Sequence, residues 1–208
     1  MRYLGGTAVT HDSRLVTAPE VHIGEDGGRA ALLVDGVVQS ISPEDGLATG
    51  GYWAAMVPLD RPTRGLVLGL GGGTLVRLLY ARWGTFPVVG VDDDPNIVEV
   101  ARSAGWLPEP PHLQVVLADA FAFVQSCQER FDYVAVDLFR GEQLAARAFG
   151  KPFLRRLRSV MSPRGQVAIN MFADIRMLAR IARIETMFEL RERRQVGGNI
   201  VIQARRRR

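Results

Sequence analysis

Residues 66–74 read LVLGLGGGT, a short apolar run that passes into a cluster of glycines and then into a predicted helix over residues 74–82. This order is typical of nucleotide sites, because glycine lets the chain turn tightly and lets a ligand approach the backbone. Unpaired N–H groups there would attract a carboxylate, a phosphate or a ribose. We therefore predict that Gly69, Gly71, Gly72 and Gly73 contact a nucleotide cofactor. The alternative is a turn that serves only strand–helix packing.

Acidic residues follow the next three predicted strands. Asp92 ends the strand of residues 88–91 and lies about 20 residues beyond the glycines, where a carboxylate can accept both ribose hydroxyls. One of the two aspartates that follow it is expected to cap the next helix. Asp119 follows residues 113–117 and can accept a hydrogen bond from an adenine amino group, or cap a helix. Asp137 follows residues 133–136. Ligands of open α/β sheets lie outside the carboxyl ends of the strands, so these acids predict one nucleotide site.

From residue 66 onward, short apolar strands alternate with helices. This alternation predicts a parallel sheet covered by helices on both faces. Toward the C-terminus we predict a helix over residues 143–160 that is interrupted near 150–152, a strand over 166–171, an amphipathic helix over 174–188 and a closing hairpin of residues 191–196 and 199–203. The expected fold is α/β, with a Rossmann-like open, mostly parallel sheet.

The N-terminal part of the chain lacks this alternation of strands and helices. Two apolar runs, residues 30–34 and 37–41, flank Asp35-Gly36, which is a strong signal for a two-residue hairpin. Residues 52–57 are apolar and are expected to begin a short helix. We therefore predict a small N-terminal β region over residues 1–58 and a Rossmann-like nucleotide-binding domain over residues 59–208.

Composition narrows the class of protein. No stretch of the 208 residues reaches the ~18 apolar residues of a membrane span, and the N-terminus lacks the apolar segment of a signal peptide. Cys127 is the only cysteine and the three histidines are scattered, so we expect neither a disulfide nor a metal site. We therefore expect a cytoplasmic protein without a membrane partner. Residues 151–208 are strongly basic, which we attribute to a solvated face rather than to specific nucleic-acid binding.

Taken in order, these motifs resemble the spermidine synthase family, whose members have the class I methyltransferase fold. The resemblance runs from about residue 30 to residue 171. It combines the Asp-Gly hairpin and its Gln39 with Tyr52, the glycine run and the acid after each strand. The hairpin with its glutamine points to this family rather than to methyltransferases at large.

The resemblance implies an S-adenosyl cofactor, with Asp92 at the ribose and Asp119, beside Ala120, at the adenine. It implies that Asp137 is the catalytic residue, which takes a proton from the attacking amine. Tyr52 and Gln39 would line the substrate site. The resemblance also implies a small-molecule substrate and a homodimer.

Several departures from the family pattern affect the choice of cofactor. The family usually carries an aspartate in its glycine loop, written GGGDGG, which grips the ammonium of decarboxylated S-adenosylmethionine and would repel the carboxylate of the intact cofactor. The loop here is shorter and has no acid between Gly69 and Thr74. Two like charges ~4 Å apart at an effective dielectric near 20 repel by about 4 kcal/mol. Because this repulsion is absent here, we expect intact S-adenosylmethionine to bind at least as tightly as the decarboxylated form. Arg140 replaces the second acid of the family's D-x-x-D, and Trp53 replaces a polar residue.

The resemblance, taken with these departures, implies a metal-free, S-adenosylmethionine-dependent methyltransferase, with Asp137 as general base or substrate anchor. Aminopropyl transfer from decarboxylated S-adenosylmethionine is the alternative within the same fold. A non-catalytic nucleotide-binding module is a hypothesis of another class. A cavity beside Asp137 and Tyr52 would favour an enzyme, whereas an apolar plug of Trp53, Leu138 and Phe139 would favour the module.

Overall fold

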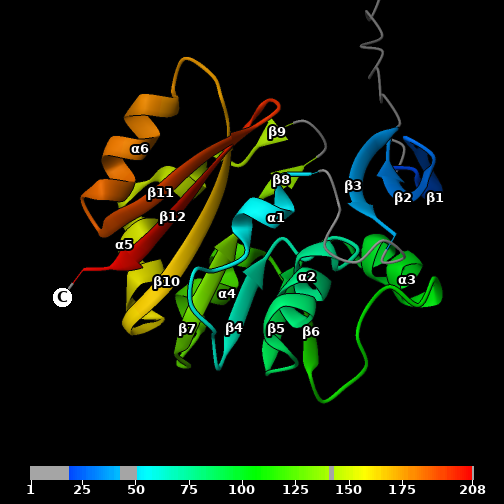
Figure 1. Cartoon of the computed structure of the whole chain (residues 1–208), viewed down its shortest axis with the longest axis horizontal. Helices are drawn as coiled ribbons and strands as arrows, with labels where there is room; N and C mark the ends of the chain where they lie inside the picture. The colour runs from blue at the N-terminus through cyan, green and yellow to red at the C-terminus, as the bar shows by residue number, and fades with distance from the viewer. Residues whose placement is uncertain (1–18, 43–50, 141–142, 208) are drawn as a thin grey trace, which may run out of the picture.

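The computed structural model describes residues 19–42, 51–140 and 143–207. Its centre is a seven-stranded sheet with the order β11-β12-β10-β7-β4-β5-β6 (Figure 1). The parallel strands are β4 (Gly65–Leu68), β5 (Val88–Asp92), β6 (Leu113–Leu117), β7 (Phe131–Val136) and β10 (Met161–Phe172). β12 (Asn199–Arg206) pairs antiparallel with β10, and β11 (Phe188–Val196) pairs antiparallel with β12 at the edge of the sheet. The predicted α/β class with an open, mostly parallel sheet is confirmed.

Helices cover both faces of this sheet, because alternate side chains of each buried strand point to opposite faces. One apolar layer contains Val67 and Ala135 and is completed by α1 (Trp53–Met56), α2 (Thr74–Trp83) and α3 (Pro95–Ser103). The other contains Leu66 and Leu68 and is completed by α4 (Ala120–Ser126), α5 (Lys151–Ser159) and α6 (Met177–Glu185). This packing exposes the carboxyl ends of the parallel strands at one edge of the sheet.

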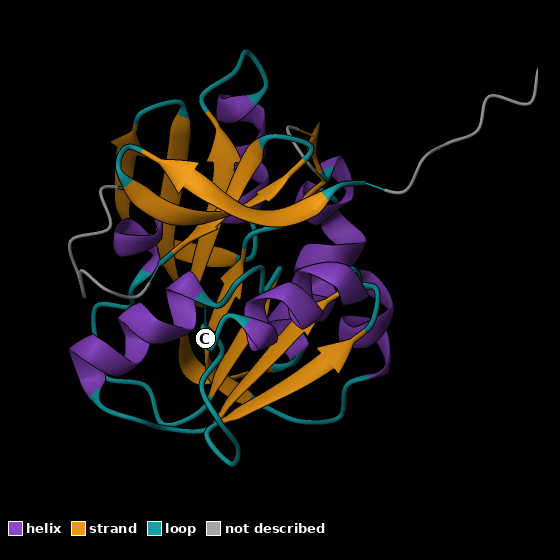
Figure 2. Ribbon diagram, turned by 90° about the vertical axis from the view of Figure 1, so that its right-hand side faces the viewer, coloured by secondary structure: helices purple, strands orange, loops and turns teal. Residues whose placement is uncertain are grey.

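A second, three-stranded antiparallel sheet consists of β1 (Val21–Asp26), β2 (Arg29–Val34) and β3 (Val37–Ile41), and it faces the viewer in Figure 2. The predicted hairpin is confirmed, since Val34 pairs with Val37 across Asp35 and Gly36. Both turn residues have positive φ, as a two-residue hairpin requires. β1 was not predicted, because its sequence lacks a clear apolar alternation. The division of the chain at residue 58 stays a prediction.

Two stretches differ from their predicted boundaries. The predicted helix over residues 174–188 is shorter, because Phe188 is fully buried at the start of β11 and pairs with Arg206. An apolar residue four positions after Ile184 fits a helical stripe as well as the start of a strand, so periodicity could not distinguish the two. Residues 143–149, predicted as helix, form β9 (Gln143–Leu144), which pairs with β8 (Phe139–Arg140), and a 3-10 turn (Ala146–Phe149). None of the described helices is long and apolar enough to span a bilayer.

Candidate functional site

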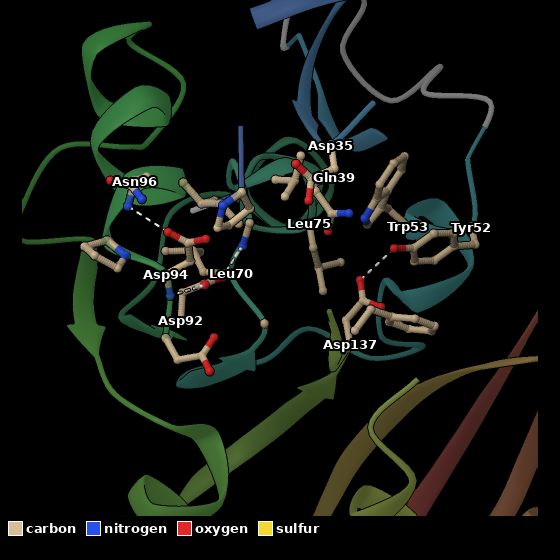
Figure 3. A pocket seen from close by; sticks show the side chains of 18 residues that line it. Asp35, Gln39, Tyr52, Trp53, Leu70, Leu75, Asp92, Asp94, Asn96 and Asp137 are labelled. Carbon is tan, nitrogen blue, oxygen red and sulfur yellow. Dashed lines mark hydrogen bonds between the residues drawn. The ribbon is translucent and has the colours of Figure 1, made fainter. Parts of the chain in front are cut away.

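A cavity of about 590 Å³ opens at the carboxyl ends of β4, β5 and β7 (Figure 3). Its walls come from the β2–β3 hairpin, from α1, from the glycine loop and from the residues that follow β5 and β7. Trp53 and Phe139 lie in these walls and leave the space beside Asp137 and Tyr52 open. The cavity therefore has the place expected of a ligand site in an open α/β sheet, and the apolar plug that would have favoured a non-catalytic module is not observed.

The glycine loop approaches the end of β7 most closely at Gly69. This residue has a φ of +86°, and a Cβ there would lie 2.1 Å from the carbonyl oxygen of Asp137, so a larger residue does not fit. Gly69 and Gly71 line the cavity. Gly72 and Gly73 do not, because they face Ser40 and Leu107. Contact between the four glycines and a cofactor stays a prediction, and the geometry favours it for the first two.

The N–H groups of the glycine loop already have partners within the protein. The N–H groups of Gly69 and Leu70 donate to the carbonyl of Val91, and that of Gly73 donates to the carbonyl of Leu70. The N–H of Gly71 donates to the carboxylate of Asp92, and that of Gly72 donates to the hydroxyl of Ser40. All five distances lie between 2.6 and 3.1 Å. The expectation that unpaired amides of this loop would attract an anion is therefore wrong for residues 69–73.

Asp92 is fixed by two backbone amides. Its Oδ2 accepts from Gly71 at 2.8 Å and its Oδ1 from Asp94 at 3.1 Å. Burial raises the pKa of Asp92, while these two hydrogen bonds oppose the rise. Asp94 caps α3 by accepting from the N–H of Asn96, as predicted for one of the paired aspartates. Asp92 thus lies at the cavity wall with its carboxylate oriented, and binding of ribose hydroxyls stays a prediction for it.

Three residues that the sequence did not indicate join the small sheet to the glycine loop. Ser40 is 1% exposed and accepts from Gly72, while Thr74 Oγ1 accepts from the N–H of Ile41 at 3.1 Å. The Arg77 guanidinium donates to the carbonyls of Gly72 and Ile41. Burial lowers the pKa of Arg77 to about 10, so it remains a cation at neutral pH. The contacts that link the small sheet to the loop and to α2, namely Ser40 with Gly72 and Ile41 with Thr74 and Arg77, join residues more than 30 apart and leave no local sequence signal.

Asp137 is held by side chains from two other elements. Its Oδ2 accepts from the Tyr52 hydroxyl at 3.0 Å, and its Oδ1 accepts from Nδ2 of Asn170, on β10, at 2.9 Å (Figure 3 shows the contact with Tyr52). Asn170 is 1% exposed, and its own oxygen accepts from Nδ2 of Asn199 at 3.0 Å. The sequence predicted Asp137 and Tyr52 for this site but missed both asparagines.

Burial raises the pKa of Asp137 from its usual 3.8 to about 6, and the hydrogen bonds from Asn170 and Tyr52 limit the rise. A carboxylate with this pKa is ionised at neutral pH and is more basic than an exposed one, which suits a general base. Burial, and then the charge of Asp137, raise the pKa of Tyr52 well above its usual value. The tyrosine therefore stays protonated and donates to Asp137.

Asp119 and Ala120 line an adjoining cavity of about 350 Å³, together with Gly69 and Asp92. Asp119 also caps α4, because its Oδ1 accepts from the N–H of Ala122 at 2.8 Å. The capping role is thus observed, and contact with an adenine amino group stays a prediction. Gln39 lines the main cavity near Trp53 (Figure 3), and its role toward substrate is likewise untested.

The main cavity is acidic. Five aspartates line it: Asp35, Asp92, Asp93, Asp94 and Asp137. Among the residues whose side chains the structure describes, no lysine, arginine or histidine lines it; the side chain of Arg140 lies outside that set. A wall of this charge attracts cations and repels anions. Within the described ranges, no group of three or more histidine, cysteine, aspartate or glutamate side chains is arranged to hold a metal ion.

Comparison with known proteins gives consistent matches. Residues 32–172 match the spermine/spermidine synthase domain. A polyamine aminopropyltransferase from Chromobacterium violaceum is 30% identical over 182 residues, which cover 82% of this chain and 69% of that protein. The crystal structure of spermidine synthase from Thermotoga maritima has a TM-score of 0.65 at 14% identity, covering 89% of this chain and 72% of that one. Human methyltransferase-like protein 13 in complex with SAH has a TM-score of 0.63 at 22% identity, covering 70% and 72%.

The two structural matches agree on the fold, because both superpose well at low sequence identity. The chain spans less than half the length of some other curated relatives, 30% of one and 47% of another.

Proposed function

Because the chain belongs to the spermine/spermidine synthase family, we propose that it is a transferase that moves the aminopropyl group of decarboxylated S-adenosylmethionine to an amine. The observation that carries this proposal is the charge of the main cavity, whose described walls contain five aspartates and no basic side chain. A donor and an acceptor that are both cations fit such walls. The open space beside Asp137 supports an enzyme rather than a binding module.

The choice of donor depends on its carboxylate. Intact S-adenosylmethionine carries a carboxylate that needs a positive partner or free N–H groups. The amides of residues 69–73 donate to protein atoms, so they offer no free N–H groups without rearrangement. Decarboxylated S-adenosylmethionine lacks this group and carries only positive charge, which the aspartates stabilise. The missing loop acid, which favoured the intact cofactor on sequence grounds, is offset by the other carboxylates of the cavity.

The reaction is a displacement at carbon. The nitrogen lone pair of the acceptor amine forms a bond to the propyl carbon attached to the sulfonium, and the carbon–sulfur bond breaks with its electron pair moving to sulfur. The products are a neutral thioether and a protonated secondary amine. Before the attack, Asp137 accepts one proton from the acceptor ammonium, which frees the nitrogen lone pair, while the hydrogen bonds from Tyr52 and Asn170 hold its carboxylate in place. Positioning of the two reactants supplies the rest of the rate enhancement.

Methyl transfer from intact S-adenosylmethionine is the second candidate, and it was the preferred function on sequence grounds. Two features favour it: the glycine loop has no acid, and Arg140 stands where the family has the second acid of D-x-x-D. The fold also occurs in the human methyltransferase-like protein 13. The C. violaceum relative, in contrast, is named an aminopropyltransferase.

Product analysis distinguishes the two reactions. The purified protein is incubated with putrescine or spermidine as acceptor and with either donor, and the nucleoside product is identified by mass spectrometry. Methylthioadenosine from the decarboxylated donor, in the presence of amine only, is the expected result. S-adenosylhomocysteine from the intact donor, with no turnover of the decarboxylated one, would replace this proposal by methyl transfer. Binding of either donor without turnover over a broad amine panel would favour the non-catalytic module.

Small cationic amines are the proposed partners of the cavity. The homodimer and the cytoplasmic location expected from the sequence stay predictions, as does the absence of specific nucleic-acid binding. Sedimentation of the purified chain would test the first of these directly.

A further inference from the structure

The opposite end of the large sheet carries a group of arginines, Arg130, Arg158, Arg206 and Arg207, which we call the arginine cluster. Arg130 directly precedes β7, Arg158 lies in the last turn of α5, and Arg206 ends β12. In Figure 1 the C-terminus emerges beside α5 and the start of β10. Asp137 lies seven residues beyond Arg130 along β7, so the cluster is roughly 20 Å from the catalytic end of that strand. It is thus separate from the S-adenosyl cavity.

The guanidinium groups of the cluster converge on backbone carbonyls. Nη1 of Arg130 donates to the carbonyl of Met161 at 3.3 Å and to that of Ser159 at 2.6 Å, and Arg206 donates to the same Met161 oxygen. Arg158 donates to the carbonyl of Arg207 at 3.2 Å. Two cations that share one acceptor oxygen lie within a few ångströms of each other, where their repulsion is unfavourable.

No carboxylate offsets this repulsion among the described residues. The ion pairs formed elsewhere by Arg64, Arg180, Arg191, Arg194 and Arg205 do not involve the cluster. Burial, and then the charges of Arg158 and Arg130, lower the pKa of Arg206. The Nε of Arg158 is buried and has no hydrogen-bond partner. The cluster therefore combines excess positive charge with an unused, buried donor.

We propose that the arginine cluster binds a phosphate group, either as inorganic phosphate or as part of a small phosphorylated metabolite. Guanidinium groups donate in a planar fork that matches the oxygens of phosphate, and charge-assisted hydrogen bonds of this kind are stronger than neutral ones. A phosphate would accept from donors that the carbonyls leave free and would neutralise like charges that now face each other. This inference does not depend on the proposed transferase activity.

Thermal unfolding of the full chain tests the proposal, with inorganic phosphate and ATP as the two probes and chloride at equal ionic strength as the reference. Ligand binding to the folded state should raise the midpoint by about 3–5 °C for each tenfold excess over the dissociation constant. Stabilisation by inorganic phosphate assigns the site to free phosphate. Stabilisation by ATP alone assigns it to a phosphorylated metabolite.

The informative variant is Arg130→Gln/Arg206→Gln, which should abolish the phosphate-dependent shift. The matched control is Arg176→Gln/Arg183→Gln, which removes the same charge from two exposed arginines at α6 and should keep the shift. Arg158→Gln is a milder variant that should weaken it at least threefold in apparent affinity, in case the double variant does not fold. Equal midpoints in phosphate, ATP and chloride, or a full shift in Arg130→Gln/Arg206→Gln, would overturn the proposal.

Discussion

The two halves of the cavity are built in different ways. In the half next to β4 and β5, which we propose binds the donor and call the donor half, Asp92 is fixed by the amides of Gly71 and Asp94, so backbone geometry determines where its carboxylate points. In the half next to β7, which we propose binds the acceptor and call the acceptor half, Asp137 is fixed by the side chains of Tyr52 and Asn170, which lie 85 and 33 residues away in the sequence. A local backbone arrangement fixes the first carboxylate, and long-range side-chain contacts fix the second.

Because the two carboxylates are fixed independently, substitutions in the donor half should change the affinity for the donor, and substitutions in the acceptor half should change the turnover rate. The largest effect is expected for Asp137→Asn. An amide cannot take the proton of the attacking amine, so turnover should fall by about 10²–10⁴-fold while the affinity for the donor is retained. Steady-state rates and donor calorimetry on the same preparation check this. Turnover within threefold of the native protein would remove Asp137 from the mechanism.

The raised pKa of Asp137 also predicts the sign of a stability change. The folded state holds this proton up to about pH 6, whereas the unfolded chain releases it near 3.8. The ionised carboxylate therefore destabilises the folded state above pH 6, by up to about 3 kcal/mol, and this penalty disappears as the pH falls toward 4. Asp137→Asn should be at least as stable as the native protein at pH 8. A clear loss of stability at that pH would contradict this account of the acceptor half.

In the donor half, Asp92→Ala should weaken donor binding at least tenfold. The expected cause is the loss of charge-assisted hydrogen bonds to the ribose, together with a less ordered Gly71. Calorimetry measures the dissociation constant, and circular dichroism checks that the fold is intact. An unchanged dissociation constant would show that Asp92 serves only the loop and α3.

A smaller effect is expected for Asn170→Leu, which removes a hydrogen bond that lowers the pKa of Asp137. The rate should rise with pH, because Asp137 must be ionised, and it should reach half its maximum near pH 6 in the native protein. In the variant this midpoint should lie at a higher pH, so the variant loses more activity at pH 6 than at pH 8. Asn199→Ala, which acts only through Asn170, should shift the profile less. A uniform loss at every pH would point to misfolding instead.

The sequence predicted that Gly69, Gly71 and Asp92 lie together at the carboxyl ends of neighbouring strands, where they line one cavity, because these signals are local. A strand, a glycine turn and an acid at the end of the next strand lie within about 30 residues, and their geometry follows from sheet topology. The hairpin was predictable for the same reason, since Asp35 and Gly36 both adopt the positive φ that the turn requires.

The remaining parts of the site depend on long-range contacts, which no local sequence pattern indicates. Ser40, Arg77 and Asn170 are polar residues in or beside apolar elements, and only the assembled fold shows which partner each one meets. The preference for methyl transfer had a related origin. It relied on single-residue departures from the family pattern, chiefly the missing loop acid and Arg140 in place of the second acid of D-x-x-D, whereas the structure brings five aspartates around one cavity. That preference remains unconfirmed.

Calorimetric titration with the two donors, at equal pH and ionic strength, tests the central claim most directly. The acidic cavity with no described basic wall predicts that decarboxylated S-adenosylmethionine binds at least tenfold more tightly than the intact cofactor, and that the preference decreases at high salt. Equal affinity, or tighter binding of intact S-adenosylmethionine, would contradict the claim and restore methyl transfer as the leading function.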